Sequence, residues 1–401
     1  MTTFSKFFSD RTKNLTCKDL LHPDYESCSS FLWYFIRESS FRCLKYLGPL
    51  ILIPLVANLQ NTTLNEWKEK AEIYFKMSIG SAATVAFSFG VHCFLCKMCD
   101  GIRYFNMSCI PMLVSLLICV NHLPPKFAKI QYLFVNNLLV QTLLRTSDNQ
   151  TVKLIRESRM VSTVLFMALS SCIMGLMGLM TEESHRYWYA QNFEHKKSEK
   201  ESESELIEKM DLLKDLIYKQ VMSTVKVGVL MSSIKILTKS VQLLRKSIFQ
   251  FIVFFVQNFD YKLLGFFAMY GTSFQVFNFL LNELNTKWEQ HKKSFLAGLL
   301  AGTAFYLSPR YFLFTYALTA LVELVMKLFL SKLDKNAKTT KFLKNISWLK
   351  VFICISLPTF SHWRIVNPWL IPQVMDKMMH IIGLDRLALG SQNYAKYILG
   401  I

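Results

Sequence analysis

One local group of residues has side chains that could bind a metal ion. His92, Cys93, Cys96 and Cys99 follow one another at intervals found in parts of zinc and iron–sulfur sites. A structural zinc site needs four ligands, and no second pair of cysteines follows this group. On a helix, Cys93 and Cys96 share one face, and Cys99 turns only partly toward it. We therefore interpret the group as apolar packing at a helix end, with S-acylation of the thiols and metal binding as alternatives.

No arrangement of residues in the sequence predicts catalysis. The eight histidines are scattered along the chain and form no paired-histidine motif. The sequence also contains no G-x-S-x-G nucleophile motif and no phosphate-binding P-loop. We therefore expect a protein that is not an enzyme, and we assign no catalytic residue, no cofactor and no metal ligand.

Two pairs of polar residues lie in stretches that are otherwise apolar. Glu323 is followed four residues later by Lys327, and Gln141 is followed at the same spacing by Arg145. A charge at the bilayer centre costs about 2.5–3.5 kcal/mol on insertion scales, so it usually faces the protein interior and a partner. Residues four apart lie on one helix face, which predicts an ion pair between Glu323 and Lys327. A polar site for a substrate or a proton at Glu323 is the alternative.

The composition indicates a membrane protein. Of the 401 residues, 52% are hydrophobic and only 18% are charged, against about 25% charged residues in a typical soluble domain. The net charge of +18 would suit a nucleic-acid-binding protein, but the basic residues stand in ones and twos between apolar stretches. Such residues flank and orient membrane helices and attract anionic lipid headgroups. We therefore expect membrane lipids, and no nucleic acid, as partners.

Ten apolar stretches are candidate membrane segments, because a spanning helix needs about 17–25 mostly apolar residues. Some of them are short, and we expect about eight to ten segments that cross or enter the membrane. The stretches are Phe41–Leu59, Ile73–Met98, Phe105–Leu123, Phe127–Leu144, Met160–Met180, Ser247–Val256, Leu263–Leu281, Phe295–Leu307, Tyr311–Leu330 and Trp348–Thr359. The predicted fold is an all-α, polytopic helical membrane protein.

The two halves of the chain resemble each other. Residues 134–145, FVNNLLVQTLLR, align without a gap with residues 316–327, YALTALVELVMK, so that Gln141 matches Glu323 and Arg145 matches Lys327. Each half also carries small residues at every fourth position, which lie on one helix face and allow close helix packing. These residues are Ser78, Ala82, Ala86 and Gly90 in the first half, and Ser294, Gly298 and Gly302 in the second.

Four regions follow from these patterns. Residues 1–159 form a cysteine-containing N-terminal region with the first membrane repeat, and residues 160–219 form a membrane helix with a charged connector. Residues 220–365 form the second membrane repeat, and residues 366–401 form a C-terminal tail. In the connector, residues 194–205 carry too little apolar surface to become ordered. A short amphipathic helix is predicted after them from the spacing of Leu206, Met210, Leu213 and Ile217.

From roughly His22 to Leu384, the sequence resembles the transmembrane protein 135 family. His22-Pro23 and Cys28 are similar to the family's cysteine-containing N-terminal region. Asn137-Leu138 and residues 141–145, QTLLR, continue the resemblance, although the family usually has Glu in place of Gln141. The resemblance is strongest in the FLAG sequence of residues 295–298 and onward through residues 321–323, LVE. The family's late Arg-Pro segment reads NPW at residues 367–369, so the C-terminal tail has no implied role.

The resemblance implies a multi-pass protein of peroxisomal or mitochondrial membranes. It implies a non-enzymatic role in lipid homeostasis and in the balance between organelle fission and fusion. The family is also similar to the small translocase subunits of the mitochondrial inner membrane, which share small-residue ladders in paired helices. Expected partners are membrane lipids, other organelle membrane proteins or a second copy of the chain. A transporter or translocase-like pore for lipid or a small solute is one alternative, and a membrane-bound lipid-modifying enzyme is another.

Overall fold

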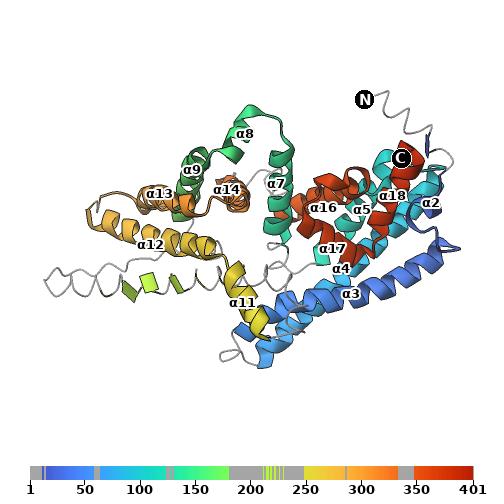
Figure 1. The fold of residues 1–401 in the computed structure, drawn as a ribbon, viewed down its shortest axis with the longest axis horizontal. Helices are drawn as coiled ribbons and strands as arrows, with labels where there is room; N and C mark the ends of the chain where they lie inside the picture. Colours follow the sequence, from blue (N-terminus) through green and yellow to red (C-terminus); the bar gives the residue numbers. More distant parts are fainter. Residues whose placement is uncertain are drawn as a thin grey trace. The chain divides into compact units, whose positions relative to one another are not determined.

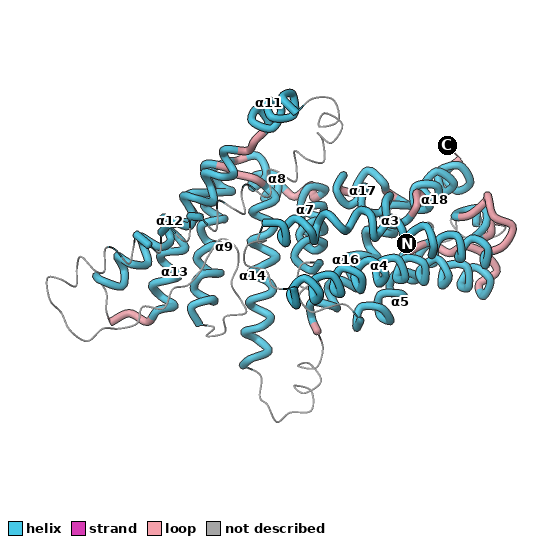
Figure 2. Tube along the Cα trace, turned by 90° about the horizontal axis from the view of Figure 1, so that it is seen from below, coloured by secondary structure: helices cyan, strands magenta, loops and turns pink. Residues whose placement is uncertain are grey.

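The part of the chain that the structure describes is largely helical, with turns and short loops between the helices. The computed structural model describes residues 11–12, 15–57, 64–122, 128, 131–179, 248–284, 287–332 and 347–400, with isolated residues between 211 and 229. These residues form α-helices, short 3-10 helices and π-helical turns, and no strand occurs among them (Figure 1 and Figure 2). The predicted all-α class is confirmed. The charged run 194–205 and most of the predicted amphipathic helix lie outside the described residues.

The chain divides into two compact units, of which unit 1 contains residues 1–146 and 344–401. Short 3-10 and π-helical segments connect several of its helices. The described α-helices of unit 1 are α2 (Cys17–Leu21), α3 (Cys28–Ala57), α4 (Leu64–Met98), α5 (Cys109–Cys119), α7 (Asn137–Thr146), α16 (Trp348–Val366), α17 (Gln373–Gly383) and α18 (Arg386–Tyr394).

Helices α3 and α4 pack against each other as a long hairpin in unit 1. Phe89 of α4 lies edge-on to Phe35 of α3, with ring centroids 4.8 Å apart. The Tyr74 hydroxyl of α4 donates a hydrogen bond to the Leu44 carbonyl of α3. The small residues predicted to form one face of α4 are all buried or half-buried: Ser78, Ala82, Ala86 and Gly90.

The C-terminal helices complete unit 1. Helix α16 packs against α5 and against the π-helical turn η4 (Tyr132–Asn136), where the Ser356 hydroxyl donates to Asn136 Oδ1. Helix α18 packs against α2, and Asn393 Nδ2 donates to the carbonyl oxygens of Asp19 and Leu20 at 2.9 and 3.0 Å. The division predicted from the sequence differs here, because it placed residues 344–365 in the second repeat. Their packing partners lie instead in the N-terminal part of the chain.

Unit 2 contains residues 147–343. Its core consists largely of aromatic and small side chains, including Phe166 of α9, which stacks on Phe305 with a centroid separation of 4.3 Å. The described elements of unit 2 are α8 (Gln150–Glu157), α9 (Arg159–Leu179), α11 (Ile248–Asn258), α12 (Tyr261–Leu284), α13 (Gln290–Ala301), the 3-10 segment η6 (Gly302–Leu307) and α14 (Tyr311–Lys332).

Helices α9 and α13 approach each other closely because glycine lies at their contact. A Cβ atom on Gly298 would lie 2.8 Å from Met174 Cβ and 2.9 Å from the Ser170 carbonyl oxygen. A Cβ atom on Gly302 would lie 2.6 Å from Met167 Cα. The short distance between the two backbones also allows a hydrogen bond between the helices, in which Ser170 Oγ donates to the Gly298 carbonyl at 2.7 Å. Gly298 and Gly302 of the predicted small-residue face therefore lie at a helix contact, and Ser294 is buried.

Four of the described helices are long and apolar enough to cross a membrane. Each contains most of one of the predicted stretches: Trp67–Met98, Arg159–Leu179, Tyr261–Leu284 and Tyr311–Lys332. Some of the other predicted stretches form shorter or interrupted helices, whereas most of Phe41–Leu59 lies within the 30-residue helix α3. The stretch from Phe295 to Leu307, for example, changes from α-helix to 3-10 helix at Gly302. The total of about eight to ten membrane segments stays a prediction.

Substitution of Gly298 by alanine is expected to destabilise unit 2 by about 1–3 kcal/mol, because the added methyl group overpacks the contact with α9. Gly265 of α12 provides a matched control, since a Cβ atom there would meet nothing within 4 Å. Gly265→Ala is expected to stabilise the protein by about 0.5–1 kcal/mol through the higher helix propensity of alanine. Unfolding of the purified protein in detergent measures both effects. Equal effects of the two substitutions would contradict the close contact.

Candidate functional site

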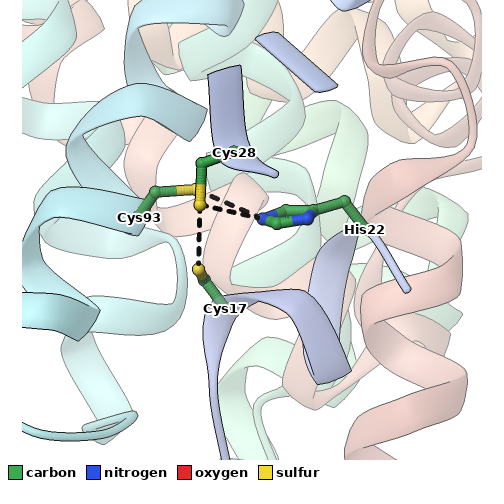
Figure 3. Close-up of side chains that lie close together, drawn as sticks. All are labelled: Cys17, His22, Cys28 and Cys93. Carbon is green, nitrogen blue, oxygen red and sulfur yellow. Dashed lines mark hydrogen bonds between the residues drawn. The ribbon is translucent and has the colours of Figure 1, made fainter. Parts of the chain in front are cut away.

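Three cysteines and one histidine converge in unit 1. The side-chain ligand atoms of Cys17, His22, Cys28 and Cys93 all lie within 4.8 Å of one another, and they point toward a common centre (Figure 3). The sulfurs of Cys17 and Cys28 are 3.5 Å apart. His22 Nε2 lies 3.7 Å from Cys28 Sγ and 3.4 Å from Cys93 Sγ. We call these four residues the Cys–His cluster.

Local structure places each member of the Cys–His cluster. Cys17 is the first residue of α2, whose start is fixed by a capping box in which Thr16 N donates to Asp19 Oδ2 at 2.8 Å. His22 follows the last residue of α2, and Cys28 is the first residue of α3. Cys93 lies near the C-terminal end of α4, which the hairpin brings beside the start of α3. Three separate segments therefore meet at the cluster.

The imidazole of His22 is fixed by burial and stacking. His22 is 1% exposed, and its ring stacks on Phe31 with a centroid separation of 4.7 Å and an interplanar angle of 17°. Nε2 faces the sulfurs, whereas the buried Nδ1 has no hydrogen-bond partner among the described residues. The Arg386 guanidinium lies 5.7 Å from the centre of the Phe31 ring and pairs with Asp24 at 3.0 Å.

The cluster favours a thiolate on Cys17. A hydrogen bond from the Cys93 thiol, with further contacts from His22 and Cys28, lowers the pKa of Cys17 to about 4, although burial acts in the opposite direction. Burial raises the pKa of Cys28, and the neighbouring Cys17 raises it further. These contacts favour the thiolate form of Cys17, and a thiolate is the form that binds metal ions.

The structure separates the members of the group from His92 to Cys99. Cys93 contacts His22, but the His92 ring turns elsewhere, with Nδ1 2.7 Å from the Asn106 carbonyl oxygen and Nε2 3.4 Å from Cys96 Sγ. Cys99 Sγ accepts a hydrogen bond from Asn106 Nδ2 at 3.5 Å. Sequence reasoning included Cys93 but did not join it to Cys17, His22 and Cys28. The usable signal was the short spacing of those three residues before a long helical hairpin.

The polar residues of the apolar stretches occupy different settings. Glu323 in α14 is 3% exposed, and Lys327 Nζ donates to its Oε1 at 2.5 Å. In unit 1, Gln141 of α7 is 8% exposed, whereas Arg145 one turn later is exposed. The buried carboxylate of Glu323 therefore has a cation within hydrogen-bonding distance on its own helix.

Unit 2 also contains an apolar cleft of about 670 Å³. Its walls come from α9, α13 and α14, with Leu176, Phe295, Leu321 and Val325 among the apolar side chains. Trp288, His291 and Lys292 lie among the lining residues at the start of α13, and Glu289 is 3.3 Å from His291 Nε2 and 3.5 Å from Lys292 Nζ. The surface that all these residues present to the cleft is almost wholly apolar, and the Lys292 ammonium faces Glu289.

Comparison with known proteins adds no assignment to these sites. No protein-family model, no curated protein and no solved structure matches this chain.

Proposed function

We propose that this chain is a polytopic, non-enzymatic membrane protein with two related halves that binds lipid and acts in lipid homeostasis. We further propose that it resides in peroxisomal or mitochondrial membranes, where it influences organelle fission and fusion. The apolar cleft of unit 2 is the observation that carries the lipid-binding function. The organelle and its dynamics rest on the sequence resemblance to the transmembrane protein 135 family.

Exposed apolar side chains on the long helices support a lipid environment. On α9, Met160 and Val164 are 66% and 61% exposed, and on α14, Val325 and Phe329 are 48% and 54% exposed. Large apolar patches are rare on soluble monomers, because apolar surface in contact with water is unfavourable. Both helices are long and apolar enough to span a bilayer, in which such surfaces face acyl chains.

The lining of the cleft suits the acyl chain of an anionic lipid. A volume of about 670 Å³ lies within the range of about 300–1,000 Å³ that is usual for small-molecule sites. Leu176, Leu321 and Val325 provide apolar contact for a hydrocarbon chain. Lys292 and Trp288 have the amphipathic side chains that proteins place at membrane interfaces, where a lysine attracts a phosphate or carboxylate headgroup.

A photoactivatable analogue of phosphatidic acid is expected to label peptides of α9 and α13 in the purified protein. Leu176→Trp should reduce labelling severalfold by filling the cleft, whereas Val164→Trp, on an exposed face of the same helix, should not. Lys292→Gln should lower the preference for anionic over zwitterionic lipid by about fivefold, the equivalent of roughly 1 kcal/mol per lysine. Mass spectrometry of the labelled peptides measures the effect of all three substitutions. Labelling that Leu176→Trp leaves unchanged would reject the cleft as the lipid site.

The buried Glu323 favours a transporter as the second candidate function. If the protein carries lipid or solute past this residue, Glu323→Gln should reduce flux by at least about tenfold while leaving expression intact. Reconstituted vesicles can be tested with a fluorescent phospholipid and with carboxyfluorescein. Glu157→Gln removes an exposed carboxylate from the same unit as the control. Unchanged flux in the Glu323 variant would remove this residue from any transport pathway.

An internally tagged copy is expected to colocalise with peroxisomal or mitochondrial markers. The tag is placed within residues 194–205, a charged run that the sequence predicts to be a solvated connector. Confocal imaging and organelle fractionation measure the distribution. A signal confined to the plasma membrane or the secretory pathway would overturn the organelle assignment and leave lipid binding to be judged by the labelling experiment alone.

A further inference from the structure

The Cys–His cluster has the spacing of a tetrahedral metal site. With zinc–sulfur and zinc–nitrogen bonds of about 2.3 and 2.05 Å, tetrahedral ligands lie about 3.8 Å apart for two sulfurs and about 3.6 Å apart for sulfur and nitrogen. Three of the six separations are 3.5 Å between Cys17 and Cys28, and 3.7 and 3.4 Å from His22 Nε2 to Cys28 and Cys93, and every pair lies within 4.8 Å. Four side chains from three segments thus surround a point that fits one metal ion (Figure 3).

We propose that Cys17, His22, Cys28 and Cys93 bind a structural zinc ion. Three thiolates and one imidazole form one of the ordinary ligand sets of structural zinc, and all four positions are filled by protein side chains. No coordination position is left for a substrate or a reacting water, so the site is structural. The soft sulfur ligands discriminate against magnesium and calcium, which bind through oxygen. The proposal does not depend on lipid binding or on the organelle.

Other readings of the cluster explain less of it. A disulfide between Cys17 and Cys28 would use two of the three sulfurs and leave Cys93 and the His22 nitrogen in contact without a role. The structure has all ten cysteines as free thiols. Simple apolar packing explains buried sulfurs but not why the Nε2 of a histidine that is 1% exposed faces two of them. Metal coordination accounts for all four ligand atoms at once.

Zinc would hold a short N-terminal segment in place. Helix α2 has five residues, too few for an isolated helix to be stable in water. Coordination by Cys17 and His22 fixes both of its ends to the open end of the α3–α4 hairpin through Cys28 and Cys93. A zinc ion with three thiolates has a net charge of −1, and Arg386 provides a nearby positive charge beyond the Phe31 ring.

Metal analysis of the intact protein in detergent tests the proposal. The wild-type protein is expected to contain about one zinc ion per chain, as measured by inductively coupled plasma mass spectrometry. The double variant Cys17→Ser/Cys28→Ser and the single variant Cys93→Ser should each lose more than about nine-tenths of it. Cys96→Ser is the matched control, because Cys96 is a buried thiol one helical turn from Cys93 but outside the cluster. Zinc content near zero in the wild type, or an equal loss in the control, would overturn the assignment.

A second measurement on the wild-type chain does not depend on the folding of any variant. Alkylation with N-ethylmaleimide, mapped by mass spectrometry, should modify Cys17, Cys28 and Cys93 at least about tenfold faster after a zinc chelator is added, because zinc-bound thiolates are protected. Cys96 should change much less. Equal rates with and without chelator, a Cys17–Cys28 disulfide in the isolated protein, or iron in place of zinc would each contradict the proposal.

Discussion

The close approach of helix backbones is the constraint on which unit 2 depends. In the bilayer that we propose for this protein, apolar helices gain little from burying apolar surface against each other, so packing and hydrogen bonds must hold them together. At Gly298 and Gly302, the missing side chains let α13 lie directly on α9, and Ser170 and Ser171 of α9 donate to carbonyl oxygens of α13 at 2.7 and 2.9 Å. The same contact sets the width of the neighbouring cleft. Phe295 fits against Gly175 at one wall, and the α14 side chains form another.

Unit 1 is held by a different combination of forces. Its long hairpin is secured by aromatic contacts such as that between Phe35 and Phe89, and Gly90 of α4 lies against Leu32 of α3. The short helix α2 contributes Leu20 and Leu21, each 1% exposed, to the apolar core of unit 1. It is also positioned by its capping box, by the Cys–His cluster, and by Asn393 of α18, whose amide donates to two carbonyl groups near the end of α2. Polar and sulfur contacts thus add to apolar packing at this helix.

Local patterns explain which features could be predicted from the sequence. Long apolar stretches and a spacing of four residues involve neighbours on one helix, so the four long helices, the small-residue faces and the proximity of Glu323 and Lys327 require no tertiary information. The Cys–His cluster requires tertiary information, because Cys93 joins the N-terminal residues only after the α3–α4 hairpin has formed. For the same reason, the sequence patterns could not place α16 beside α5 or α18 beside α2. The apolar cleft likewise requires tertiary information, because α9 meets α13 and α14 there although both follow it much later in the sequence.

The discontinuity of unit 1 has a consequence for synthesis. The ribosome releases α2, α3 and α4 early, but their partners α16 and α18 follow only after all of unit 2 has been made. Unit 2 is continuous in the chain and can complete its contacts while translation proceeds. The N-terminal helices of unit 1 keep apolar surface exposed until α18, which ends at Tyr394, has left the ribosome. If the ribosome stalls after unit 2 but before α16, the nascent chain therefore contains a complete unit 2 and an incomplete unit 1. The incomplete unit 1 is then accessible to chaperones and quality-control proteases.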